Sequence, residues 1–280
     1  MKYGVLARIP AGGDLKENCE KAFSRIEKAE LEACQLVYKP EKYTVEDAEI
    51  IRESAAKHNV EISAQFLGYY DSNCVWDGRF DFRLCGINSP LFGGDRINYI
   101  ISAIPFVKAL GITDVIIHAG YVPNDPFAEQ YANMVCAVRL FGQRLKAQGL
   151  NLLFETGQES PITLLRLIRD VGLDNLFVNL DTANFILYGY GNPVDAMYTF
   201  GHLVRNVHAK DGVPPTVPDC RGTETNLGEG FVDFPKVFKM LKERGYDRYM
   251  IMENELSLEN TDETIENSIK YLKKLWNEVE

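Results

Sequence analysis

Five consecutive apolar segments of the chain each end on an ionisable side chain. The segments contain VIIH, NLLFE, LFVNLD, VRNVH and MIME, and their last polar residues are His118, Glu155, Asp181, His208 and Glu253. Two of the four histidines of the chain stand at such ends. Buried carboxylates are costly unless a partner of opposite charge or a metal compensates them. If the segments lie side by side, their ends therefore form an acidic cluster that needs a cation.

A divalent metal ion is the cation that this combination of residues favours. Three carboxylates that converge without a matching ring of basic residues repel one another, and a divalent ion removes that repulsion. Two glutamates, one aspartate and one histidine supply mixed oxygen and nitrogen ligation, which suits Mn, Mg, Co or Zn without choosing among them. We therefore expect Glu155, Asp181, His208 and Glu253 to hold one divalent metal ion. Each of these residues taken alone is equally typical of a helix cap, a salt bridge or a buried histidine.

Eight short apolar runs alternate with eight longer amphipathic runs along the chain. Continuous apolar runs of this kind are typical of parallel strands that are buried on both faces. The expected strands cover residues 3–9, 34–39, 60–67, 114–119, 151–155, 176–181, 204–210 and 249–253. The expected helices cover residues 14–30, 44–58, 95–110, 127–148, 162–170, 193–200, 234–244 and 261–279.

Eight repeated βα units predict an α/β fold of the (β/α)8 TIM-barrel type. Parallel βα units connect by right-handed crossovers, and eight of them close into a barrel of about 250 residues. The chain has 280 residues, so residues 1–280 are expected to form a single barrel domain. A doubly wound open sheet would show a glycine-rich phosphate loop after its first strand, whereas this chain has ARIPAGGDLKEN there. Two long connections, 68–94 and 212–233, are expected to cover the active-site face, with Trp76 and Phe92 as candidate pocket walls.

Composition limits the classes of partner and the compartment. The net charge of −10 argues against binding to nucleic acid or to an anionic membrane. The six cysteines form no CxxC pair and suggest no disulfide framework. The first residues lack the apolar core of a signal peptide, and no apolar run approaches the roughly 20 residues of a membrane helix. We therefore expect a cytoplasmic protein with neither a nucleic-acid nor a membrane partner.

Several strings in the second half of the chain resemble the xylose-isomerase-like barrel family of sugar-phosphate isomerases and epimerases. They are ETGQE (155–159), NLDTAN (179–184), VHAKDG (207–212), NLGEGFVDFPK (226–236) and the segment MIMENE that contains Glu253. The family includes ketose 3-epimerases, hydroxypyruvate isomerases, inosose dehydratases and metal-dependent AP endonucleases. In its ketose epimerases one divalent metal is held by Glu, Asp, His and Glu. The resemblance assigns these roles to Glu155, Asp181, His208 and Glu253, and it makes the two glutamates the acid and base groups.

The resemblance implies proton transfer on a sugar or sugar phosphate. Removal of a proton next to a carbonyl gives an enediolate, whose negative charge a metal stabilises, and two glutamates move the proton. An inosose-type dehydratase on the same metal site is the alternative. A non-catalytic sugar-binding barrel is a weaker one, and so is an AP endonuclease, which needs a basic groove and more histidines than four.

The substrate is expected to be a small sugar or polyol, bound by a protein that could form a homo-oligomer. Candidate substrate-binding residues are His118, Asn184, Lys210 and Arg221. Asn184 stands where the epimerases have a histidine, so it keeps a hydrogen bond without a titratable group. Few basic residues fall on the expected mouth of the barrel, which favours an uncharged sugar unless a few of them cluster. The basic residues that could do so are Arg8, Lys39, Lys210 and Arg221.

Overall fold

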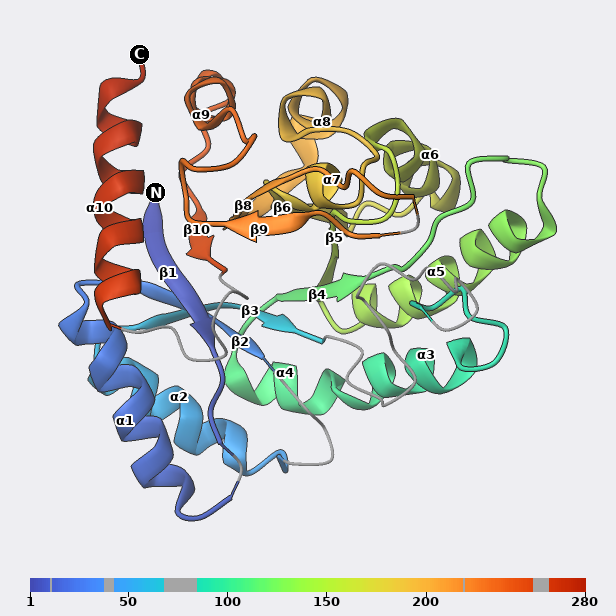
Figure 1. Ribbon diagram of the computed structural model, residues 1–280. Coiled ribbons are helices and arrows are strands. Elements are labelled where there is room, and N and C mark those ends of the chain that lie inside the picture. Colours follow the sequence, from blue (N-terminus) through green and yellow to red (C-terminus); the bar gives the residue numbers. More distant parts are fainter. Residues whose placement is uncertain (11, 38–42, 68–84, 219, 254–261) are drawn as a thin grey trace.

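Eight parallel strands form a closed barrel in the computed structural model of the chain (Figure 1). The structure describes residues 1–10, 12–37, 43–67, 85–218, 220–253 and 262–280. The barrel strands are β1 (Lys2–Ala7), β2 (Ala33–Val37), β3 (Glu61–Phe66), β4 (Asp114–His118), β5 (Asn151–Glu155), β6 (Leu176–Asp181), β7 (Val204–Ala209) and β10 (Tyr249–Met252). They pair in the order β1-β10-β7-β6-β5-β4-β3-β2, and β1 closes the ring against β2. The predicted (β/α)8 barrel is confirmed.

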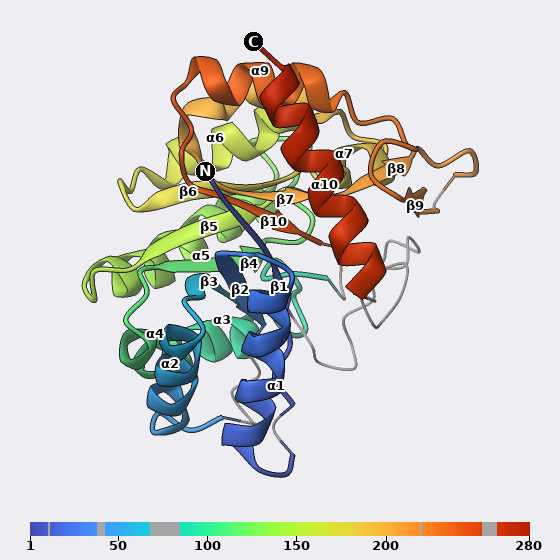
Figure 2. The ribbon, with the colours of Figure 1, turned by 90° about the vertical axis from the view of Figure 1, so that its left-hand side faces the viewer.

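The helices surround the strands on the outside (Figures 1 and 2). They are α1 (Leu15–Lys28), α2 (Asp47–Lys57), α3 (Gly93–Ser102), α4 (Ile104–Leu110), α5 (Glu129–Lys146), α6 (Pro161–Val171), α7 (Asn184–Leu187), α8 (Pro193–Phe200), α9 (Phe234–Glu243) and α10 (Asp262–Glu278). In Figure 1, α6, α8 and α9 lie along the top of the view, and α1, α2 and α4 lie along the bottom. The ends of the ring meet where Arg25 Nε of α1 lies 2.6 Å from Asp262 Oδ1 of α10.

One expected helix is two helices in the structure. The run 95–110 is divided into α3 and α4 at Ala103. Pro105 lies in the first turn of α4, and a proline has no N–H to continue the hydrogen-bond ladder of the preceding helix. The prediction of one continuous helix was therefore wrong, although Pro105 was the signal that could have corrected it.

Short elements inside the connections were not predicted. They are α7, a 3-10 turn (Gly201–Leu203) and an antiparallel hairpin of β8 (Asp211–Val213) and β9 (Thr223–Thr225). Each is three or four residues long, so neither hydrophobic periodicity nor helix capping distinguishes it from a loop. The hairpin lies in the connection 212–233 that was expected to cover the active-site face.

Alternation along each strand decides which side chains enter the barrel. In β5, Leu152 and Phe154 pack with the apolar layer beneath the helices, whereas Leu153 belongs to a separate inner cluster. The inner cluster consists of Leu6, Ala33, Val37, Ala64, Phe66, Ile116, Leu153 and Ile251. Because side chains two residues apart share a face of a strand, Glu155 follows Leu153 into the barrel, and Glu253 follows Ile251. The inner apolar layer thus separates these carboxylates from the opposite end of the barrel.

Two further observations concern the class of protein. Across the described parts of the chain, no helix combines the length and the apolar character needed to cross a bilayer. The described cysteines are free thiols, of which Cys136 and Cys220 are exposed.

Candidate metal centre

The structure brings Glu155, Asp181, His208 and Glu253 together at the carboxyl ends of four barrel strands. Glu155 and Asp181 are the last residues of β5 and β6, His208 lies near the end of β7, and Glu253 directly follows β10. One possible ligand atom from each residue lies within 4.8 Å of the others. The most exposed of the four is Glu253, at 7%. Four side chains from separate strands therefore surround one small buried volume.

The two nitrogens of His208 have different surroundings. Nδ1 lies 2.7 Å from Glu155 Oε1 and 2.9 Å from Glu253 Oε2, whereas Nε2 lies 2.8 Å from Gln35 Oε1 of β2. Because an amide oxygen accepts a hydrogen bond, Gln35 favours a proton on Nε2. That arrangement leaves Nδ1, the nitrogen among the carboxylates, for a cation. Sequence reasoning missed Gln35, since a glutamine inside an apolar strand carries no spacing signal.

The carboxylate of Asp181 is oriented by the turn that follows β6. Its Oδ1 accepts the backbone N–H of Ala183 at 2.8 Å and of Asn184 at 2.7 Å. These two bonds hold Oδ2 on the side of the cluster, where it lies 4.0 Å from His208 Nδ1 and 3.4 Å from Lys210 Nζ. The DTAN string thus fixes one metal-ligand candidate through its own backbone.

The cluster fits a divalent metal ion. Glu155 Oε2, Asp181 Oδ2 and Glu253 Oε2 are buried and have no hydrogen-bond partner of acceptable geometry. Buried carboxylate oxygens without hydrogen bonds are unfavourable, and oxygen-preferring divalent cations compensate them. With the imidazole Nδ1, these oxygens make a mixed oxygen and nitrogen ligand set. Glu155, Asp181, His208 and Glu253 are therefore the residues that would hold such an ion.

Charges within the cluster shift the pKa values of its members in opposite directions. Burial lowers the pKa of His208, but the neighbouring Glu155 and Glu253 outweigh burial and raise it to about 10. Burial raises the pKa of Asp181 to about 8. Burial also acts to raise the pKa of Glu253, but the cations of Lys210 and His208 hold it well below its usual range. Without a metal, protons and one lysine balance the negative charge.

Two of the four predicted substrate-binding residues lie beside the carboxylates. His118 Nε2 is 3.1 Å from Glu155 Oε2, and Lys210 Nζ is 3.2 Å from Glu253 Oε2. His118 is 17% exposed at its side chain, whereas Lys210 is almost fully buried. The ring of Phe66 contacts the His118 ring edge-on at a centroid distance of 6.3 Å.

The side chains of the other two predicted substrate-binding residues contact groups other than the carboxylates and the imidazole of the cluster. Asn184 Nδ2 donates to the backbone oxygen of Thr156 at 2.9 Å, so this side chain joins the ends of β5 and β6. The Arg221 guanidinium lies 5.8 Å from the centre of the Tyr188 ring and 3.9 Å from Glu224 Oε2. Both residues therefore support the turns around the cluster.

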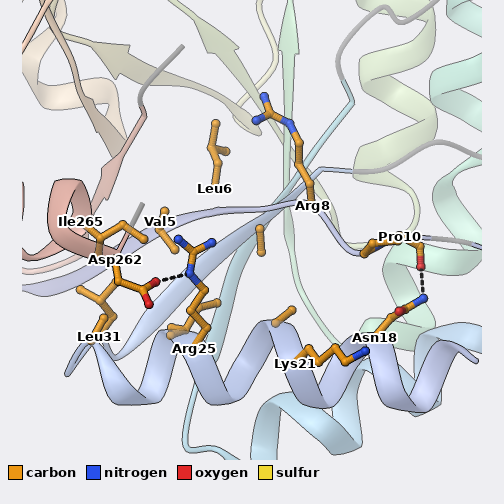
Figure 3. A pocket seen from close by; sticks show the side chains of 14 residues that line it. Val5, Leu6, Arg8, Pro10, Asn18, Lys21, Arg25, Leu31, Asp262 and Ile265 are labelled. Atoms are coloured by element: carbon orange, nitrogen blue, oxygen red, sulfur yellow. Dashed lines mark hydrogen bonds and ion pairs between the residues drawn. The ribbon is translucent and has the colours of Figure 1, made fainter. Parts of the chain in front are cut away.

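Phe92 and Arg8 are the described members of the remaining aromatic and basic candidates. Trp76 and Lys39 lie outside the described residues. Phe92 immediately precedes α3, and its ring lies 5.5 Å from the guanidinium carbon of Arg96. Arg8 lines a hollow of about 650 Å³ between β1 and α1, together with the residues labelled in Figure 3. This hollow contains none of the four cluster residues, so Arg8 and Lys210 line different places.

Asp211, directly after the HAK string, organises the loop that borders the cluster. Its Oδ1 accepts the N–H groups of Gly212 and Val232, and its Oδ2 accepts those of Gly228 and Gly230, all within 3.1 Å. A Cβ at Gly230 would lie 2.2 Å from Asp211 Oδ1, and Gly228 has a φ of +87°. The LGEG string therefore needs both glycines to wrap a buried carboxylate. Sequence reasoning had not assigned this role to Asp211.

The fold and the site define a (β/α)8-barrel protein with a candidate divalent-metal centre at the carboxyl ends of its strands. The model of the xylose isomerase-like TIM barrel family matches residues 23–275, and the chain belongs to this family.

Three similar proteins illustrate the range of the family. The crystal structure of a xylose isomerase domain protein from Planctomyces limnophilus is 25% identical with a TM-score of 0.88, and the match covers 99% of this chain and 97% of that one. The structure of D-psicose 3-epimerase with D-tagatose from Clostridium cellulolyticum H10 is 14% identical with a TM-score of 0.71, covers 99% of both chains, and shows the shared fold. An inosose dehydratase from Clostridium botulinum (strain Alaska E43, type E3) is 24% identical over 162 residues, 52% of each chain. The chain thus spans no more than about half the length of the curated relatives it matches.

Proposed function

We propose that the protein is a divalent-metal-dependent enzyme that isomerises or epimerises a sugar or sugar phosphate. The proposal rests on one observation: carboxylate oxygens of Glu155 and Glu253 lie 2.7 Å and 2.9 Å from the same atom, His208 Nδ1. Two carboxylates from different strands therefore approach one point, where one accepts a proton from substrate and the other returns it. Epimerisation at a carbon next to a carbonyl uses such a pair of groups on opposite faces, and isomerisation uses one of them.

The residues of the cluster have different roles in this reaction. Glu155 and Glu253 are the base and the conjugate acid, and Asp181 and His208 complete the ligand set. A bound divalent cation supplies Lewis-acid stabilisation of the negative charge that appears when the proton leaves. Lys210 adds a second positive charge next to Glu253. His118, beside Glu155, is placed to donate a hydrogen bond to a hydroxyl group of the sugar. The apolar layer beneath the cluster excludes water from below.

A dehydratase of a cyclic polyol is the second candidate. It begins with the same proton removal but then expels a hydroxide ion instead of returning a proton. Two observations favour it: the curated relatives that match about half of the chain are inosose dehydratases, and Asn184 occupies the place of an epimerase histidine. The two candidates share the metal centre and differ in the product.

Proton exchange with solvent tests the shared first step. Protein reconstituted with Mn²⁺ or Co²⁺ is incubated in deuterated water with a panel of ketoses, aldoses and inososes, and loss of the substrate C–H signal is followed by NMR. We expect exchange with at least one substrate, and a decrease of about 10²–10⁴-fold in Glu253→Gln. Glu229→Gln, in the exposed turn where Glu229 accepts from Asn226, is the matched control and should exchange normally.

The products separate the two candidates. A new isomer supports the isomerase or epimerase, whereas loss of water supports the dehydratase. If metal-loaded protein exchanges no C–H proton in any sugar or inosose of the panel, the proposed chemistry is wrong.

A further inference from the structure

The side chain of Lys210 ends among the carboxylates of the candidate metal centre. Its Nζ lies 3.2 Å from Glu253 Oε2 and 3.4 Å from Asp181 Oδ2, and the residue is 2% exposed. These two oxygens are among the three that have no hydrogen-bond partner of acceptable geometry. The ammonium group therefore competes for the same oxygens that a divalent cation would use.

The backbone on both sides of Lys210 is fixed by buried side chains. Thr182 is the residue after Asp181. Its Oγ1 accepts the backbone N–H of Lys210 at 3.1 Å and donates to the backbone oxygen of Lys210 at 2.5 Å. Asp211, the residue after Lys210, is held by the four N–H groups described above. A lysine held in this way keeps a fixed place in the centre.

Lys210 contributes to the charge balance of the centre. Three carboxylates carry three negative charges, of which a divalent cation balances two once His208 is a neutral ligand. The ammonium of Lys210 balances the third. Without Lys210 the centre attracts a cation more strongly, because like charges a few ångströms apart repel each other in a buried site. With Lys210 an additional positive charge remains for the oxygen on which negative charge develops in the reaction.

We propose that Lys210 is the built-in counter-ion of the metal centre, weakening its affinity for the divalent cation while supplying the extra positive charge for the reacting substrate. This inference rests on the proposed function. The inference predicts that removal of the Lys210 charge strengthens metal binding but slows catalysis. A residue that only maintained the structure would, when removed, weaken both metal binding and catalysis.

The test measures metal affinity separately from activity. Metal is removed from the full chain with a chelator, and Mn²⁺ binding is measured by calorimetry in wild type, Lys210→Met and Lys210→Gln. Both substitutions remove the charge, and Lys210→Met also keeps the shape of the side chain. We expect Mn²⁺ to bind about 10-fold more tightly or better in both variants, and C–H exchange to fall about 100-fold. Lys210→Arg, which keeps the charge, should stay within about threefold of wild type in affinity.

Lys146→Met is the matched control, because Lys146 forms an exposed ion pair with Asp174 at the end of α5. It removes the same charge from an exposed ion pair that includes none of the cluster residues, and it should leave the Mn²⁺ affinity unchanged. Circular dichroism verifies folding, and the Gln variant replaces the Met variant if the latter does not fold. Unchanged or weaker affinity in the neutral variants, with Mn²⁺ still bound by wild type, overturns the role of Lys210 alone. If wild type binds no Mn²⁺, the metal centre and this inference both fail.

Discussion

Nδ1 of His208 lies 2.7 Å from Oε1 of Glu155, although β6 separates their two strands in the barrel. Both side chains point inward from staggered strand ends, so they meet across the curved inner surface. With Glu253 on the other side of the same nitrogen, a proton on Nδ1 is stabilised by two carboxylates. This proton occupies the position among the ligands that a metal would take.

Metal binding should therefore release protons. The pKa of His208 is about 10 without metal, so at pH 7 the imidazole is protonated and must lose a proton to become a ligand. Because the metal-free state binds more protons, a rise in pH favours the metal-bound state. Asp181, whose pKa is about 8 without metal, also loses a proton when it becomes a ligand, so we expect Mn²⁺ affinity to increase between about tenfold and a hundredfold per pH unit between pH 6 and 8. Calorimetry in buffers of different ionisation enthalpy measures the protons released, and a binding heat independent of the buffer would contradict the expectation.

The strand ends could be predicted from the sequence because two simple rules act on them. Parallel strands place their carboxyl ends on one face of the barrel, and alternation places every second side chain inside. Glu155 and Glu253 follow both rules, each two residues after an inward apolar residue, Leu153 and Ile251. The barrel strands themselves could equally well be predicted from their continuous apolar runs.

What could not be predicted is the support around these side chains. Gln35 and Asp211 act through tertiary contacts, one across the barrel and the other with a loop 17 to 21 residues away. Neither contact leaves a period or a spacing in the sequence. The break between α3 and α4 is different, because Pro105 marks it in the sequence, although the pattern of residues 95–110 predicts one helix.

Substitution of Gln35 tests whether its hydrogen bond with His208 contributes to metal binding. Gln35→Leu removes the acceptor for His208 Nε2 and leaves a buried N–H unpaired, so the imidazole loses its orientation. Partners of metal-ligating histidines typically contribute about 10–100-fold in metal affinity. We expect a loss of this size in the Mn²⁺ titration of Gln35→Leu.

A neighbouring glutamine provides the comparison. Gln65, on β3 next to β2, is equally buried, but its Nε2 donates to the backbone oxygen of Leu36 at 2.7 Å. Gln65→Leu should lower the melting temperature without a comparable change in Mn²⁺ affinity. Equal losses of affinity in both variants would show that Gln35 contributes only to packing.

Residues at the opposite end of the barrel should affect the stability of the fold but not metal binding. Asp114 begins β4 and is buried, with Arg248 Nη2 at 2.9 Å, Arg205 Nε at 3.2 Å and Asn151 Nδ2 at 2.7 Å. The charges at this end serve the fold, since catalytic groups of such barrels lie at the carboxyl ends of the strands. The two arginines are partly exposed, so their pairing with Asp114 is intermediate between a buried and a surface ion pair.

Asp114→Asn should therefore lower the free energy of unfolding by about 2–3 kcal/mol, because it keeps the shape but leaves two arginines without their carboxylate. Urea titration measures this loss, and calorimetry should find the Mn²⁺ affinity of the folded variant unchanged. Asp174→Asn, which breaks the exposed pair with Lys146, is the control and should cost less than about 1 kcal/mol. A parallel loss of Mn²⁺ affinity in Asp114→Asn would mean that the two ends of the barrel are coupled through the inner apolar layer.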